Sequence, residues 1–284
     1  MMNKLIVLLL LCCPLIVDAQ FFEVGASIGS SNYRGELSSN SSTIDFKETN
    51  LSAGALVRYN INHLFAVRLH GRFTTLSGDD AQSDVELIQD RNLNFETNIY
   101  EVGLTGEINL LGFDPQAGSI SPYLFAGYTY FQFNPQTELD GRVIDLQELG
   151  TEGQGLAEYP DRTPYELSQW AIPFGLGFKY ALSENIHIGL EIGARKLFTD
   201  YLDDVSLTYP NLQFFDLDDP GNVAAQLSDR SISPGEKTGF GRGDTNSNDW
   251  YFITNFTVTY NFLDTGTIGG RRSGRRSKVG CPTF

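Results

Sequence analysis

Ten charged side chains recur on the polar side of alternating stretches in this 284-residue sequence. For example, Arg68, His70 and Arg72 occupy every second position, whereas apolar Val67 precedes Arg68 and Leu69 lies between Arg68 and His70. Successive side chains of a strand point to opposite faces, so each stretch would gather its charges on one face of a sheet. Acids and bases on such a face could form ion pairs or carry protons or a solute. The ten residues are Glu23, Arg58, Arg68, His70, Arg72, Glu101, Glu107, Lys179, Glu191 and Arg195.

The histidines give little support for catalysis or metal binding. His63, His70 and His187 do not have the spacing of zinc ligands. His70 lies in the middle of an alternating stretch and His187 lies beside a short turn. Neither is therefore placed at the outer end of a strand, where a hydrolase would hold its histidine near an aspartate or serine. We expect no enzyme activity and no cofactor.

Three other motifs are weak. Residues 242–244 spell Arg-Gly-Asp, the tripeptide of integrin ligands, but three residues in a Gly/Asp-rich stretch arise readily by chance. Residues 150–155 are rich in glycine but lack the following lysine and serine of a phosphate-binding loop. Asp200, Asp203 and Asp204 could supply oxygen ligands to Ca²⁺, or could be a solvated strand end.

The elements that would position the ten charges are strands. Alternation of apolar and polar residues indicates strands wherever it is sustained. One example is 248–262, where Trp250, Phe252 and Phe256 fall on one face, opposite Asn255, Thr257 and Thr259; Ile253 and Thr254 break the pattern. Eight such stretches are present, at 21–34, 51–60, 65–74, 95–111, 122–133, 167–180, 186–198 and 248–262.

The connections between these stretches alternate between long and short. The long ones are polar and cover 35–49, 78–91, 134–164 and 203–248. An even number of strands, with short turns at one end and long loops at the other, is typical of outer-membrane barrels. The sequence therefore predicts an all-β protein, an eight-stranded antiparallel transmembrane β-barrel.

A soluble eight-stranded barrel would fill its interior with the apolar face. Here the faces opposite the apolar ones carry the ten charges, too many for a dry core. An apolar face turned to lipid and a polar face turned to the lumen fit better. Because eight strands leave an interior that side chains fill, we expect the charges to pair into a polar plug, with a proton or solute path as the alternative.

The N-terminus has the features of a signal peptide. Lys4 precedes an apolar segment from Leu5 to Val17, and a small-residue cleavage site ends at Ala19, so residues 1–19 would be removed and 20–263 would form the barrel. Cleavage removes Cys12 and Cys13. Cys281 then remains, and a disulfide through it would be intermolecular. The formal net charge of −15 argues against nucleic acid as a partner.

The C-terminal segment 264–284 is basic, although the chain is acidic. It carries a net charge of +4, from five basic residues against Asp264. In a barrel with an even strand count this tail would lie in the periplasm. It could be a solvated tail, or it could dock an acidic periplasmic partner, with Cys281 available for a covalent link. The candidate docking residues are Arg271, Arg272, Arg275, Arg276, Lys278 and Cys281.

Several strings resemble the PorG-type outer-membrane barrels of Bacteroidota. The most specific one is Thr-Asp-Tyr-Leu-Asp-Asp-Val-Ser, which ends at Ser206. The likeness extends over nearly the whole chain after the signal peptide. The strings lie at 56–62, 91–95, 122–127, 149–154, 172–180, 198–206 and 248–252.

The resemblance implies a place in the cell outer membrane and a role in the type IX secretion system. The partners it implies are the periplasmic ring proteins PorK and PorN. The alternative is a small structural or adhesive barrel, similar to the OmpA and OmpX types, that binds extracellular ligands through its long loops. A third possibility is a solute channel, which the narrow interior of eight strands disfavours.

Overall fold

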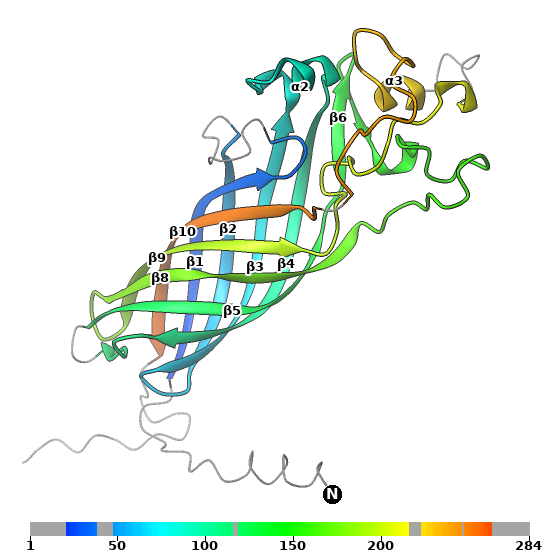
Figure 1. The fold of residues 1–284 in the computed structure, drawn as a ribbon. Coiled ribbons are helices and arrows are strands. Elements are labelled where there is room, and N and C mark those ends of the chain that lie inside the picture. The colour runs from blue at the N-terminus through cyan, green and yellow to red at the C-terminus, as the bar shows by residue number, and fades with distance from the viewer. Residues whose placement is uncertain (1–20, 39–47, 116–118, 216–222, 246, 263–284) are drawn as a thin grey trace, which may run out of the picture.

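The computed structural model describes residues 21–38, 48–115, 119–215, 223–245 and 247–262. Strands make up most of these residues (Figure 1). In chain order they are β1 (Phe21–Arg34), β2 (Asn50–Asn60), β3 (Phe65–Asp79), β4 (Asn94–Asn109), β5 (Ile120–Gln132), β6 (Pro135–Leu139), β7 (Arg142–Asp145), β8 (Ser168–Ala181), β9 (Ile186–Leu197) and β10 (Trp250–Phe262). The helical turns between them are η1 (Asp80–Gln82), α2 (Glu86–Arg91), η3 (Gln147–Leu149), η4 (Leu212–Phe214) and α3 (Ala224–Ser228).

Eight of the strands form a closed antiparallel barrel. Around the barrel the order is β1, β2, β3, β4, β5, β8, β9 and β10, and β10 returns to β1. This closing seam runs from Phe22 opposite Phe262 to Arg34 opposite Trp250. The remaining strands, β6 and β7, form a hairpin that pairs with β4 near its start, where Glu96 lies opposite Gln136. The predicted eight-stranded antiparallel barrel is confirmed.

The two ends of the barrel differ, as the alternating connections predicted. Short connections, at 61–64, 110–119 and 182–185, meet at the end that we call the short-turn end. Phe22 and Phe262 pair at this end, so the first and last strands begin and finish there. The long connections meet at the other end (Figure 1). We call their described residues, within 35–49, 80–93, 133–167 and 198–249, the cap.

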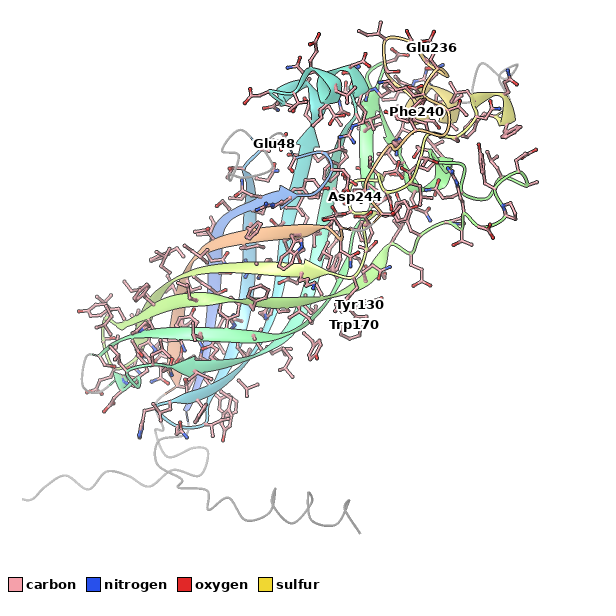
Figure 2. The ribbon with its side chains drawn as sticks, viewed as in Figure 1. Glu48, Tyr130, Trp170, Glu236, Phe240 and Asp244 are labelled. Atoms are coloured by element: carbon pink, nitrogen blue, oxygen red, sulfur yellow. The ribbon has the colours of Figure 1, made fainter. Side chains whose placement is uncertain are left out.

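The outer face of the barrel is apolar. Its exposed side chains include Val102, Leu104 and Leu190. Aromatic pairs mark the border nearest the cap, where Tyr130 and Trp170 project outward with ring centroids 5.3 Å apart (Figure 2). At the short-turn end, the rings of Tyr260 and Phe262 pair at 5.1 Å. An apolar band between two aromatic borders is the surface that outer-membrane barrels present to lipid.

The strand β3 is longer than the sequence pattern predicted. The pattern ends the third strand at residue 74, but β3 pairs with β4 as far as Asp79 opposite Asn94. The reason is that the alternation continues into the cap, where Leu76, Phe95 and Ile99 point into an apolar core. The same core explains why Ile253 breaks the alternation of β10, since it faces inward at the level of this core.

One strand turns its aromatic face inward. Tyr123, Phe125 and Phe131 of β5, and Phe133 just after it, are buried, although aromatic residues of the other strands, such as Phe174 and Phe256, are exposed on the outer face. Lysine and arginine lie against the first two rings: Lys179 Nζ is 4.4 Å from the ring centre of Tyr123, and the Arg68 guanidinium is 5.0 Å from that of Phe125. The inward aromatics therefore pack with the lumen cations, to which aromatic faces are attracted.

Glycine makes room for these rings. A Cβ atom at Gly193 would lie 2.6 Å from the Phe125 ring, and one at Gly177 would lie 2.5 Å from the Tyr123 ring. Both distances are shorter than van der Waals contact. Side chains at these two inward positions would displace the aromatics from the lumen.

Candidate functional site

The ten charged residues predicted from the alternation all point into the lumen and are buried. They form two groups. The lower group, nearer the short-turn end, holds three carboxylates and three cations: Glu23, Glu107, Glu191, Arg58, Arg68 and Lys179. The upper group holds Glu101 with His70, Arg72 and Arg195.

In the lower group each carboxylate contacts more than one donor. Arg58 lies between two of them, with Nη1 2.6 Å from Glu23 Oε2 and Nε 2.9 Å from Glu107 Oε2. Glu107 also pairs with Lys179, and with Arg68 at 3.3 Å. Arg68 in turn pairs with Glu191. Equal numbers of charges of each sign, in contact, satisfy one another in a place where isolated charges would be very costly.

In the upper group one carboxylate serves several partners. Glu101 Oε1 lies 3.0 Å from His70 Nε2 and 3.5 Å from Arg72 Nε. Glu101 Oε2 lies 3.4 Å from Arg195 Nε. The Tyr251 hydroxyl donates to the same oxygen at 2.6 Å. Among the described residues, Glu101 is the carboxylate that pairs with both of these buried guanidinium groups.

Polar neighbours that the charge pattern did not single out complete both groups. The Asn60 amide and the Thr259 hydroxyl donate to Glu23, each at 2.8 Å. The Tyr123 hydroxyl donates to Glu191 at 2.9 Å. Arg72 donates to Asn255 Oδ1 at 2.7 Å. The same alternation places these side chains on the inward face. The sequence could therefore have predicted them, although the charge pattern selected only ionisable residues.

Several of these contacts cross the lumen from wall to wall. Arg68 on β3 pairs with Glu191 on β9, and these strands lie opposite each other in the closed barrel. Tyr251 on β10 reaches Glu101 on β4, which is also on the opposite wall. Above them lies the apolar core that includes Phe131. Side chains therefore fill the described lumen, which is the arrangement expected of eight strands.

The cap is folded and has its own buried polar centre. Arg242 is buried and donates to the Asp204 backbone carbonyl at 2.6 Å, and its Nη1 lies 3.2 Å from Glu152 Oε1. The other oxygens of the centre are also used: Tyr165 donates to Asp204 Oδ1 at 2.7 Å, and Glu152 accepts the backbone N–H of Ser206 at 3.0 Å. This centre joins the connection 133–167 to the connection 198–249.

The burial of Arg242 bears on the Arg-Gly-Asp tripeptide at 242–244. Arg242 is 4% exposed, and its guanidinium group pairs with Glu152 and donates to the Asp204 backbone carbonyl. An integrin ligand presents its arginine on a free loop tip. The tripeptide therefore serves the packing of the cap in this conformation.

We predict that Arg242→Ala loosens the cap and leaves the barrel folded. Removing one partner of a buried ion pair costs about 3–5 kcal/mol, because the other charge stays buried and unpaired. Protease cleavage within the cap, measured on the detergent-solubilised protein, should rise by roughly tenfold or more. Arg142→Ala is the matched control, since Arg142 is an exposed arginine of the cap hairpin. Equal cleavage of the two variants would contradict the prediction.

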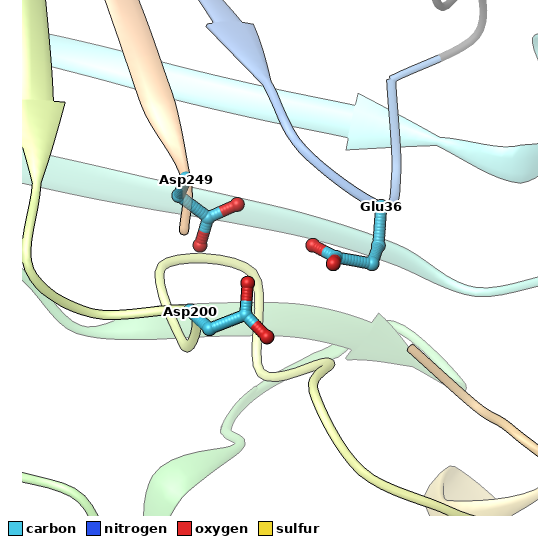
Figure 3. A group of neighbouring side chains, drawn as sticks. All are labelled: Glu36, Asp200 and Asp249. Carbon is cyan, nitrogen blue, oxygen red and sulfur yellow. The ribbon is translucent and has the colours of Figure 1, made fainter. Parts of the chain in front are cut away.

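A second polar centre of the cap lies over the outer ends of β9, β10 and β1. Glu36, Asp200 and Asp249 converge there, as Figure 3 shows. Asp203 stands behind them: the Tyr33 hydroxyl bridges Asp203 Oδ2 and Asp249 Oδ1, at 2.7 Å from each. Four carboxyl groups therefore share a small, largely buried volume.

Burial shifts the pKa of each of these carboxyl groups upward. Burial, followed by the charge of Asp200, raises the pKa of Glu36 to about 7. Burial also raises the pKa of Asp200 to about 7. The pKa values of Asp203 and Asp249 lie well above the usual aspartate range, because both groups are buried and other carboxylates stand beside them.

The structure corrects the view of Asp200, Asp203 and Asp204 as a solvated strand end. All three are buried, the last two almost completely. They also belong to different places, because Asp204 faces Arg242 and Tyr165 while the other two face Glu36 and Asp249. Burial raises the pKa of Asp204 to about 6.

The features predicted at the two ends of the chain lie outside the described residues. These are the signal peptide, 1–19, and the basic tail, 264–284. The tail includes the candidate docking residues Arg271, Arg272, Arg275, Arg276, Lys278 and Cys281. Within the described part of the chain, no helix is long and apolar enough to cross a membrane.

Solved structures with a similar fold are outer-membrane proteins. The attachment invasion locus protein Ail of Yersinia pestis is 8% identical, with a TM-score of 0.37, over 86% of this chain and 97% of that one. Neisserial surface protein A is 11% identical, with a TM-score of 0.40, over 84% and 96%. A major outer membrane protein of Thermus thermophilus is 13% identical, with a TM-score of 0.40, over 86% and 100%. No curated protein matches the sequence.

A family model matches most of the chain. It is described as a domain of unknown function, DUF6089, and it covers residues 2–224. This match includes every barrel strand before β10 and most of the cap. The chain is therefore a member of the DUF6089 family, built as a closed eight-stranded antiparallel β-barrel with a filled lumen.

Proposed function

We propose that this protein is an outer-membrane anchor for the periplasmic ring of a type IX secretion system. The observation that carries the proposal is the filled lumen. The Arg68–Glu191 ion pair and the Tyr251–Glu101 hydrogen bond cross from wall to wall, so the barrel is suited to hold something at its ends and not to pass a solute through its middle. The resemblance of the sequence to PorG-type barrels supplies the identity of what is held, a ring of the PorK and PorN type.

The short-turn end suits this role. Its turns are brief, and the first and last strands both terminate there. The basic tail, which follows Phe262 in the sequence, would therefore start on the same side as the turns. In outer-membrane barrels short turns face the periplasm, where the ring proteins would be. A cationic segment favours association with an acidic partner.

Deletion of residues 269–284 tests the docking role of the tail. We expect the truncated barrel to reach the outer membrane and to lose most of its co-purification with the ring proteins, because the deletion removes Arg271, Arg272, Arg275, Arg276 and Lys278. A shuffled tail of the same composition is the control for charge alone. Full co-purification of the truncated barrel would show that the tail is not the dock.

Cys281 allows a covalent version of the same contact. In the oxidising periplasm a free thiol can form an intermolecular disulfide. We expect a non-reducing gel of intact cells to show a species larger than the monomer, and Cys281→Ser to abolish it. Monomer alone in the unsubstituted protein would remove the idea of a covalent link.

The filled lumen also predicts that the protein does not conduct ions. Reconstituted in a planar bilayer, it should show no steady current above that of the bare membrane, because the ion pairs of Arg68 and Glu101 span the interior. A porin reconstituted in the same bilayer is the positive control. Regular current steps from the folded barrel would contradict this prediction and favour a solute channel.

A second function is supported by the size and order of the cap. The cap carries its own hairpin, helical turns and two buried polar centres, and it exposes apolar side chains such as Leu87 and Val143. Phe240 is also exposed on it, as Figure 2 shows. Connections as long as those of the cap are usually functional or disordered, and the described residues of the cap are folded. The alternative is therefore an adhesive barrel that binds an extracellular ligand or surface. A knockout strain that still exports type IX cargo would favour adhesion over the secretion role.

A further inference from the structure

Three carboxylates from distant parts of the chain meet at the outer end of the barrel. Glu36 follows β1, Asp200 follows β9, and Asp249 immediately precedes β10 (Figure 3). These strands are neighbours in the barrel, so their ends bring the three residues together. One oxygen of each carboxylate lies within 4.8 Å of an oxygen of each of the others. The three oxygens thus surround one point.

Asp200 is the most informative of the three. Its side chain is 8% exposed, and neither carboxylate oxygen has a hydrogen-bond donor among the described residues. The Ser206 side chain lies near enough to lower the Asp200 pKa, but neither carboxylate oxygen meets the geometry of a hydrogen bond with it. Buried carboxylates almost always accept hydrogen bonds or bind a cation. Asp200 points instead at two further carboxylates.

The other two members are arranged to face the same point. Asp249 is held rigidly, because its oxygens accept from the Tyr33 hydroxyl at 2.7 Å and from the Leu202 backbone N–H at 2.9 Å. Glu36 uses one oxygen to accept the Asp244 backbone N–H at 3.4 Å, and its other oxygen, Oε2, is buried without a donor. Two of the three carboxylates therefore keep unused acceptor oxygens inside the cluster.

Among the described residues, protein cations compensate the charge of the cluster only weakly. The ion pairs in the described part of the cap join Arg91 to Asp80, Lys237 to Asp90, and Arg242 to Glu152 and Asp204. Of these cations, Arg91 also donates to the Glu36 backbone carbonyl at 2.7 Å, and its charge lowers the Glu36 pKa, although more weakly than burial and the charge of Asp200 raise it. A small external cation would supply the positive charge that these ion pairs do not bring to the three carboxylates.

We propose that Glu36, Asp200 and Asp249 bind one Ca²⁺ ion at the base of the cap. Carboxylate oxygens are the ligands of hard cations, and Ca²⁺ accepts them at 2.3–2.6 Å in a flexible geometry. Oxygens up to 4.8 Å apart can lie on opposite sides of such an ion. Mg²⁺ is a poorer match, because it requires a smaller octahedron at 2.0–2.1 Å and keeps several waters.

Such an ion would connect three chain segments at the mouth of the barrel. It would tie the connection after β1 to the connection after β9 and to the start of β10. The neighbouring Asp203 already links two of these segments through Tyr33 and the Leu37 backbone N–H. The ion would thus fasten the cap to the strand ends. This role does not depend on whether the barrel serves secretion or adhesion.

Calorimetry on the full-length protein in detergent tests the site. After treatment with EGTA and desalting, titration with CaCl₂ should show one ion per chain, with a Kd on the order of 10⁻⁴–10⁻³ M, as in extracellular calcium modules. Asp200→Asn should weaken binding at least tenfold. Asp90→Asn is the matched control, because it removes a cap carboxylate outside the cluster. No binding by the unsubstituted protein, or equal binding by Asp200→Asn, would overturn the proposal.

Terbium luminescence gives a second measurement. Tb³⁺ replaces Ca²⁺ at oxygen sites and emits when a nearby aromatic side chain absorbs light. Tyr33 contacts Asp249, and Trp250 follows it in the chain, so sensitised emission should appear and should fall when excess CaCl₂ is added. The emission should be lost in Glu36→Gln, which tests the site if Asp200→Asn fails to fold. Undiminished emission in Glu36→Gln would also overturn the proposal.

Discussion

Replacing Glu101 with alanine should lower the free energy of unfolding of the barrel by about 3–5 kcal/mol, because removing one partner of a buried ion pair leaves the other uncompensated. Arg72 and Arg195 would both lose their ion-pair partner, and the Tyr251 hydroxyl would lose its acceptor. The side chain of Glu101 is fully buried, so water cannot replace these contacts without entering the lumen. Urea titration of the refolded protein, followed by heat-dependent gel mobility, measures the change.

Two variants sharpen the Glu101 experiment. Glu101→Gln keeps the shape and can still accept the Tyr251 hydroxyl, so it should recover part of the loss while leaving the guanidinium groups without their counter-charge. Glu166→Ala removes an exposed glutamate and should change the free energy of unfolding by less than about 0.5 kcal/mol. If Glu101→Ala unfolds at the same urea concentration as Glu166→Ala, the upper group does not stabilise the barrel.

Arginine in place of Leu104 should destabilise the barrel in lipid by about 2–4 kcal/mol, the cost of a lysine or arginine at the bilayer midplane of such a barrel. Leu104 points outward from β4, midway between the outward residues Tyr100 and Ile108. Lipid would surround the new guanidinium, which could not reach water without distorting the bilayer. Urea titration of protein folded into phosphatidylcholine vesicles measures the loss.

The control for this experiment lies above the membrane. Val143 is 69% exposed on β7, in the cap hairpin, so Val143→Arg should leave the free energy of unfolding within about 0.5 kcal/mol of the starting value. A larger loss of stability in Leu104→Arg than in Val143→Arg would show that lipid surrounds the barrel at the level of Leu104. Equal effects at positions 104 and 143 would mean that β4 does not cross the bilayer at Leu104.

The strands and their inward charges were predictable because the signal is local. A period of two assigns each residue to one face without any knowledge of its neighbours in space. Glu23, Lys179 and Glu191 could therefore be placed in the lumen from the sequence. The alternating lengths of the connections could likewise be matched to a barrel with two unlike ends.

The pairing of the charges was not predictable in the same way. Arg68 meets Glu191 on the opposite wall, and that choice depends on the stagger of the strands and the width of the lumen. The sequence pattern contains neither quantity. The face of β5 was ambiguous for a related reason: apolar residues such as Leu124 and Tyr128 alternate with the aromatics Tyr123 and Phe125, so hydrophobicity alone does not separate the two faces.

The fold of the cap was the feature least predictable from the sequence. Polar loops rich in Asp, Gly and Asn gave no period from which a fold could be inferred. Their buried centres are assembled from residues far apart in sequence, as in the meeting of Glu36 with Asp249. Of the three cluster residues, only Asp200 was predicted as a candidate ligand. It is close in sequence to Asp203 and Asp204, whereas Glu36 and Asp249 approach it only in the folded protein.

The seam between β1 and β10 has a consequence for how the protein reaches its folded state. It joins the first strand to the last, so the ladder cannot close until the whole barrel sequence is available. Forming contacts between residues so distant in sequence has a high entropic cost of loop closure, which slows folding. Until closure, both edge strands expose unpaired backbone groups that invite aggregation. We therefore expect the unfolded chain to require a chaperone until Trp250–Phe262 pairs with β1. Closure of this seam would be a late step of folding.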